Sequence, residues 1–149
     1  MNYKKAYSDI ISEIMKKRID GGRPVSFDEM ECTDYVAVLP TGYYAYVFPK
    51  RGFLIDKCNM GITTVMRDVY KRREYAEVLT WTGIVKQIKN SMVIELKSVS
   101  GKTVFLSEKI VKLFGKPSDL TFKSECDLKP VYIYEKEFLI GVIMPVKGD

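Results

Sequence analysis

The sequence predicts an α+β protein with antiparallel meander sheets and about three helices. Two observations predict this class. The first segment repeats apolar side chains at helical spacing, and from residue 35 onward short runs rich in Tyr, Val and Phe alternate with turn residues. A chain of this length buries roughly 68–70% of its unfolded surface, enough for a core. We expect a single domain over residues 1–149; the alternative division appends an N-terminal helix and loop, 1–34, to a two-unit sheet domain, 35–149.

The N-terminal segment has the clearest helical pattern. Over residues 3–17 the apolar positions follow the spacing i, i+4, i+7, i+8, which gathers them on one face of a helix. Lys16, Lys17 and Arg18 form a basic last turn that suits the negative end of the helix dipole, and Gly21-Gly22 ends the helix. We expect the acidic stretch that follows, residues 20–34, to be a polar loop.

The next part of the chain favours short strands and a second helix. Tyr35–Leu39, Tyr43–Phe48 and Phe53–Ile55 are separated by turn residues, which predicts a meander of strands. Apolar residues at helical spacing then predict a helix over residues 61–73, with Arg67, Lys71 and Arg72 on its opposite face.

The pattern in the second half of the chain is typical of a hairpin series. We expect strands at 77–87, 92–98 and 103–106, then a short helix at 108–114 with Ser107 as its N-cap and Gly115 and Pro117 after its end. Strands at 120–125, 130–135 and 138–144 follow. Because the last is almost continuously apolar, we expect it in the middle of a sheet.

Several classes of function are disfavoured by absences. The chain has no histidine, which removes imidazole bases and His-based metal sites. Cys32, Cys58 and Cys126 form no CxxC pair, so we expect buried free thiols in a reducing cytoplasm. No apolar stretch approaches the ~20 residues of a membrane span, no phosphate-cradling glycine loop is present, and no acid stands in an apolar setting. We therefore expect a cytoplasmic protein without enzymatic activity, metal, cofactor or membrane partner.

The positive charge is concentrated in the middle of the chain. The net charge of +5 comes from residues 50–102, which alone carry +6, whereas the first third is slightly acidic and the last third neutral. If these cations converge on one helical surface, they attract phosphate backbones. The alternative is an ordinary solvated surface.

Two basic groups are the candidate contact residues. Lys71, Arg72 and Arg73 end the second helix, with Arg67 one turn earlier, and Lys109, Lys112 and Lys116 lie along and just beyond the third. The helix dipole and solvation are the structural alternatives. The aromatic run Tyr43, Tyr44, Tyr46 and Phe48 either stacks on unpaired bases or fills the core.

The stretch Thr103–Gly115, followed by three strands ending in Gly141–Val146, resembles the closing repeat of the bacterial DNA-polymerase sliding clamp. The resemblance covers residues 103–147, and a looser copy of the same strand, helix and three-strand order spans 53–106. It implies two clamp-like units whose helices turn Arg67, Lys71 and Arg72, and Lys109, Lys112 and Lys116, toward duplex DNA. Such contacts are to phosphates and carry no base preference.

Two hypotheses of function follow. The first is a non-catalytic accessory protein that binds nucleic acid, or a replication partner, through basic helix faces. The alternative is a protein-interaction module, encoded by a phage or mobile element, whose partner meets a sheet edge or the aromatic hairpin 43–53 and whose basic surface is incidental. The sequence sets no oligomeric state.

Overall fold

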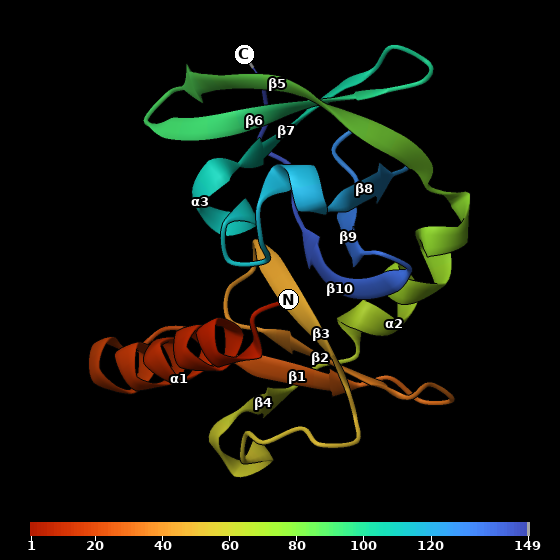
Figure 1. Cartoon of the computed structure of the whole chain (residues 1–149). Helices are drawn as coiled ribbons and strands as arrows, with labels where there is room; N and C mark the ends of the chain where they lie inside the picture. Colours follow the sequence, from red (N-terminus) through yellow and green to blue (C-terminus); the bar gives the residue numbers. More distant parts are fainter. Residues whose placement is uncertain (149) are drawn as a thin grey trace.

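The structure, a computed structural model, describes residues 1–148 and contains three α-helices and one ten-stranded sheet in that range, which confirms the α+β class (Figure 1). The helices are α1 (Tyr3–Asp20), α2 (Val65–Arg72) and α3 (Glu108–Val111), with 3₁₀ turns η1 (Lys57–Asn59), η2 (Arg73–Tyr75) and η3 (Pro117–Asp119). The strands are β1 (Ser26–Glu29), β2 (Tyr35–Leu39), β3 (Tyr44–Pro49), β4 (Gly61–Ile62), β5 (Glu77–Ile88), β6 (Ser91–Ser98), β7 (Thr103–Ser107), β8 (Thr121–Ser124), β9 (Val131–Glu135) and β10 (Phe138–Ile143).

The sheet runs in the order β4-β1-β2-β3-β10-β9-β8-β5-β6-β7, and every pair is antiparallel except β1 with β4. Its second half curls on itself, because the N–H of Val146, just after β10, donates to the carbonyl of Phe105 in β7 at 2.8 Å. Strand β10 lies between β3 and β9, which confirms the prediction that this apolar strand is central.

The first half of the sheet is covered on both faces. Alternate residues of β2 and β3, such as Val38 and Tyr46, join one core cluster with Ala6 and Ile10 of α1. Their neighbours Ala37, Ala45 and Val47 belong to a second cluster with Met66 of α2. Helices α1 and α2 therefore lie on opposite faces of the same strands, because side chains alternate along a strand.

Gly141 allows the end of the α3 region to rest on β10. A Cβ at this position would lie 2.0 Å from a ring carbon of Phe114 and 2.8 Å from the carbonyl oxygen of Ala45. Both distances are shorter than van der Waals contact, so a side chain here requires Phe114 to move. The glycine lets Phe114 pack directly against the central strand.

Two predicted elements in the first half are wrong. Phe53–Ile55 is not a strand: β3 pairs with β10 instead, and Phe53 and Ile55 pack on the core from a loop. The predicted loop 20–34 contains β1, which pairs with β2 over its whole length. The second partner of β3 is far along the chain, whereas β1 pairs with the strand that follows it, and the turn residues signal neither pairing.

Two predicted helices are shorter than expected. The helix expected at 61–73 begins only at Val65, because Gly61 and Ile62 pair with β1 as β4. The helix expected at 108–114 ends at Val111, after which the chain turns so that Phe114 is buried. Its N-cap is confirmed, since the Ser107 hydroxyl accepts the N–H of Ile110 at 3.4 Å.

Candidate nucleic-acid interface

The start of α2 is fixed by a buried carboxylate from the neighbouring strand. Asp28 of β1 is fully buried, and its Oδ2 accepts the N–H of Met66 at 3.1 Å while its Oδ1 accepts the Nε–H of Arg67 at 3.2 Å. The residue before the helix, Thr64, makes no side-chain cap, so Asp28 supplies the missing acceptor. The expectation that no acid lies in an apolar setting is therefore wrong.

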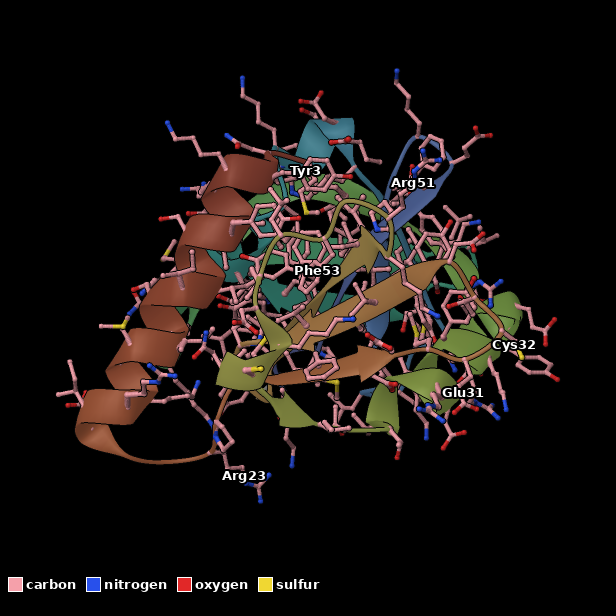
Figure 2. All side chains as sticks on the ribbon, turned by 90° about the horizontal axis from the view of Figure 1, so that it is seen from below. Tyr3, Arg23, Glu31, Cys32, Arg51 and Phe53 are labelled. Carbon is pink, nitrogen blue, oxygen red and sulfur yellow. The ribbon has the colours of Figure 1, made fainter. Side chains whose placement is uncertain are left out.

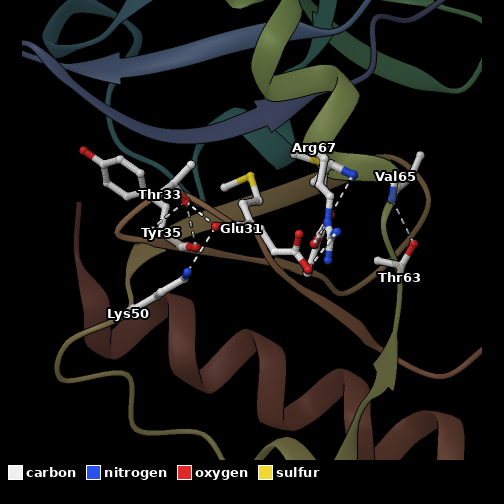
Figure 3. Close-up of polar contacts among 10 residues, drawn as sticks. Glu31, Thr33, Tyr35, Lys50, Thr63, Val65 and Arg67 are labelled. Atoms are coloured by element: carbon white, nitrogen blue, oxygen red, sulfur yellow. Dashed lines mark hydrogen bonds and ion pairs between the residues drawn. The ribbon is translucent and has the colours of Figure 1, made fainter.

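Arg67 is held between two acidic side chains, as Figure 3 shows. Besides Asp28, the Glu31 carboxylate lies 3.4 Å from its Nη1. The hydrogen bond to Asp28, followed by these two negative charges, raises the pKa of Arg67. Arg67 is therefore a structural cation whose charge is already balanced.

Arg72 and Arg73, at the end of α2, are also engaged. Arg72 forms a two-point interaction with Glu125, in which Nη2 lies 2.8 Å from Oε1 and Nε donates at 3.1 Å. Arg73 stacks with its guanidinium carbon 3.7 Å from the ring centroid of Tyr70 and donates to the Tyr70 carbonyl at 2.8 Å. Both side chains are positioned by the protein before any ligand arrives.

Lys71 is exposed, as Arg72 is, but unlike Arg72 it forms no ion pair within residues 1–148. It lines a hollow of about 440 Å³ together with Arg67 and Arg73. Glu31 and Glu74 line the same hollow. The α2 cations thus share their surroundings with carboxylates, which lowers the local positive potential.

The α3 region has a different electrostatic character. Lys109 and Lys112 line a hollow of about 620 Å³, together with Asn90, Ser91 and Met92 of the β5–β6 hairpin. Glu108 is the one carboxylate among the described lining residues. It pairs with Lys112 at 3.1 Å, an exposed i,i+4 contact of small energetic value.

Two further lysines on the hairpin extend this surface. Lys86 of β5 pairs with Val93, which in turn pairs with Ser107, so one row of the sheet runs from Lys86 to the residue before α3. Two strand spacings place their backbones about 10 Å apart. The ammonium of Lys86 lies 4.3 Å above the ring of Phe105. Lys89 follows in the exposed turn of the hairpin.

We call Lys86, Lys89, Lys109 and Lys112 the hairpin–α3 surface. Three of them, Lys86, Lys89 and Lys109, have no ion pair with any described carboxylate, and all four are exposed. The charge count includes Lys86 and Lys89 in the central surplus, but only the strand register places them beside α3. Lys5 of α1 also approaches, donating to the Lys112 carbonyl at 2.9 Å.

The structure divides the seven predicted contact residues between separate places. Helix α2 lies against β1, whereas α3 lies against β6 and β7, near the other end of the strand order. Figure 1 shows the two helices on different sides of β9 and β10. Lys116 follows α3 at the start of η3, exposed and without an ion pair among residues 1–148.

Most of the aromatic run lies in the core. Tyr44, Tyr46 and Phe48 are buried, which supports their interpretation as core residues, whereas Tyr43 is exposed. The hydroxyls of Tyr44 and Tyr46 donate to Asp9 of α1 at 2.6 and 2.9 Å.

Cys126 is buried as expected, but Cys32 and Cys58 are exposed, because both lie in turns.

Within residues 1–148 no group of three His, Cys, Asp or Glu side chains is arranged to hold a metal ion. In the same range, no helix has the length and hydropathy needed to cross a membrane. No family model matches this chain, and comparisons with curated proteins and with solved structures return no match either.

Proposed function

We propose that this protein is a non-catalytic accessory protein that binds nucleic acid by its phosphate backbone, using the hairpin–α3 surface as its main contact. The observation that carries the proposal is that Lys109 and Lys112 line a hollow whose described lining includes a single carboxylate, while the strand register places Lys86 on the row of the sheet that ends at Ser107. Lys89 lies in the hairpin turn next to Asn90, which lines the same hollow. The backbones of Lys86 and Ser107 are two strand spacings apart, about 10 Å, which is about one Debye length at 0.1 M salt. The resemblance of residues 103–147 to a sliding-clamp repeat implies DNA contact by this helix, as it does for α2.

The chemistry of the surface favours phosphates over bases. Lysine ammonium groups act as point charges and release counterions when they approach a phosphate backbone. Asn90 and Ser91 add neutral polar groups at the hairpin turn, which suit phosphate and sugar oxygens. The α2 cations contribute less, because Arg67 and Arg72 are bound to carboxylates.

The test compares two triple variants that change the net charge equally. Lys86→Glu, Lys89→Glu and Lys109→Glu reverse the hairpin–α3 surface, whereas Lys16→Glu, Lys71→Glu and Lys129→Glu reverse three exposed lysines elsewhere. Binding to a fluorescein-labelled 20-base-pair duplex is followed by fluorescence anisotropy at several salt concentrations between ~50 and ~200 mM. The same titrations with one labelled strand establish whether a duplex is required.

We expect the wild type to bind with a steep salt dependence. The hairpin–α3 variant should bind at least about 30-fold more weakly, and its log–log salt slope should fall by about 2.5–3, close to one for each lysine that no longer meets a phosphate. The second variant should stay within about 5-fold of the wild type. Equal reductions in both variants, or no binding of wild type at 50 mM salt, would refute the proposal.

A further inference from the structure

A third hollow lies away from the hairpin–α3 surface and has an apolar floor. Its volume is about 550 Å³, and its floor is formed by Leu39, Ala45 and Val142 of the adjacent strands β2, β3 and β10. Val65 and Met66, from the start of α2, form one wall. The hollow is therefore on the α2 face of the sheet.

The fold explains why this strip of sheet is left uncovered. Helix α2 has 8 residues and is about 12 Å long, so it covers only part of the face that β2, β3 and β10 present. Two residues of β3, Tyr44 and Ala45, line the hollow, and the short side chain of Ala45 does not fill the space. The hollow is a consequence of a short helix over a longer sheet.

The charges around the hollow are of one sign. Among the described residues that line it there is no Asp or Glu, whereas Lys17 and Arg23 stand at the α1 end. Lys17 is occupied by Glu13 and by the Pro40 carbonyl. Arg23 is exposed, forms no ion pair within residues 1–148, and lies in the chain between α1 and β1 in Figure 2. A ligand here therefore meets apolar surface beside a free guanidinium.

The rim of the hollow is exposed, which is typical of an open docking surface and not of an enclosed pocket. Tyr43, Val65 and Met144 remain 69%, 53% and 38% exposed, although all three line the hollow. Enclosed sites for small molecules bury roughly 70–90% of their ligand, which an open rim does not permit. Tyrosine and methionine are enriched in protein–protein interfaces. The Thr41 hydroxyl accepts the N–H of Tyr43 and keeps its own proton for a peptide carbonyl.

We propose that this hollow docks a peptide segment of a partner protein that carries large apolar side chains next to an Asp or Glu. The apolar side chains lie over Ala45 and Val142, and the acidic side chain pairs with Arg23. Charge complementarity selects this occupant: a second copy of the chain, with its net charge of +5, is electrostatically disfavoured. The phosphate backbone of a nucleic-acid duplex offers no apolar surface to match the floor.

The test selects peptides without prior choice of sequence. A phage library of random octapeptides is selected on the immobilised full-length protein, and the most enriched peptide is synthesised with blocked ends. We expect enriched sequences to combine aliphatic or aromatic residues with Asp or Glu. Replacing the acids of the synthetic peptide by their amides should weaken binding about 10-fold, as measured by fluorescence anisotropy.

Two matched variants locate the site. Val65→Asp places a carboxylate in the hollow at the first position of α2, where the helix dipole favours an acid, so the variant is expected to fold. The control is Ile62→Asp, three residues earlier: the side chain of Ile62 is 81% exposed and does not line the hollow. We expect Val65→Asp to weaken peptide binding at least 10-fold and Ile62→Asp to change it less than 2-fold.

Several outcomes would overturn this inference. The first is a selection on the wild type that enriches no peptides beyond those enriched in a parallel selection on the Val65→Asp variant. The second is enrichment of basic or uncharged peptides. The third is equal binding of the synthetic peptide to the Val65→Asp and Ile62→Asp variants. Binding of a fluorescent twelve-carbon carboxylate that no selected peptide displaces would identify a small amphiphile as the ligand instead. Because neither variant alters the hairpin–α3 surface, duplex binding reports separately on the proposed function.

Discussion

The α2 region and the hairpin–α3 surface contain similar numbers of cations but differ in what surrounds them. Asp28, Glu31 and Glu125 come from β1, the loop after it and the loop after β8, and they bind the guanidinium groups of Arg67 and Arg72. Lys86, Lys89 and Lys109 have no described carboxylate partner. Basic side chains, arginines in the α2 region and lysines in the hairpin–α3 surface, therefore hold the fold together in one region and are free to meet a ligand in the other.

The largest effect expected from this comparison is on stability. Asp28→Ala removes the acceptor for Met66 and Arg67 and leaves the start of α2 without a cap. We expect the free energy of unfolding to fall by about 2–3 kcal/mol, measured by urea denaturation. Glu31→Ala, which removes the 77% exposed partner of the same arginine, should cost less than about 0.5 kcal/mol. Equal costs would show that α2 does not depend on the buried carboxylate.

A smaller effect concerns the other end of α2, where the Tyr132 hydroxyl donates to the Val69 carbonyl at 2.6 Å. Tyr132→Phe should lower the free energy of unfolding by about 1 kcal/mol near pH 8. Burial, and then the charge of Glu125, raises the pKa of Tyr132 to about 12. An unfolded tyrosine ionises near pH 10, so this stability is present below pH 10 and is lost as the pH rises toward 12.

The measurement is therefore the difference between wild type and Tyr132→Phe at several pH values. That difference should shrink as the pH rises above about 10, whereas a difference independent of pH would contradict the assignment. Using the difference is necessary because burial and Asp9 also raise the pKa of Tyr44 and Tyr46. Tyr75→Phe, whose ring is exposed, serves as the control.

The sequence predicts the elements better than it predicts what they are next to. Strand β2 is predicted to the residue, and the N-cap Ser107 follows from local signals alone. These features depend on neighbours within four residues. Strand β1 and the burial of Asp28 depend on β2 and α2, and no periodicity in the acidic stretch distinguishes a buried carboxylate from a solvated one.

The candidate contact residues show the same limit. Sequence spacing groups Lys109 and Lys112, which line the same hollow although Lys112 is the C-cap residue after α3, but it cannot show that Arg67 and Arg72 are bound to Asp28 and Glu125, which are 39 and 53 residues away. It also cannot place Lys86 beside α3, because that depends on the register of three strands. The sequence shows where charged side chains occur, but which of them are paired with an opposite charge depends on the tertiary structure.

The smallest expected effect tests whether the negative charge of Glu108, the carboxylate beside the lysines of the hairpin–α3 surface, limits duplex affinity. Glu108→Gln keeps the size of the side chain but removes the carboxylate that lines the hollow and pairs with Lys112. Because the pair is exposed, the free energy of unfolding should change by less than about 0.5 kcal/mol. Duplex affinity should rise about 2-fold at 50 mM salt, since a phosphate no longer meets a negative charge and Lys112 is released.

The matched change in the α2 region, Glu74→Gln, should leave duplex affinity unchanged, because the remaining Glu31 still faces Arg67 there. A gain for Glu74→Gln as large as for Glu108→Gln would mean that phosphates approach both helices equally, and the difference between the two regions would then be one of stability alone.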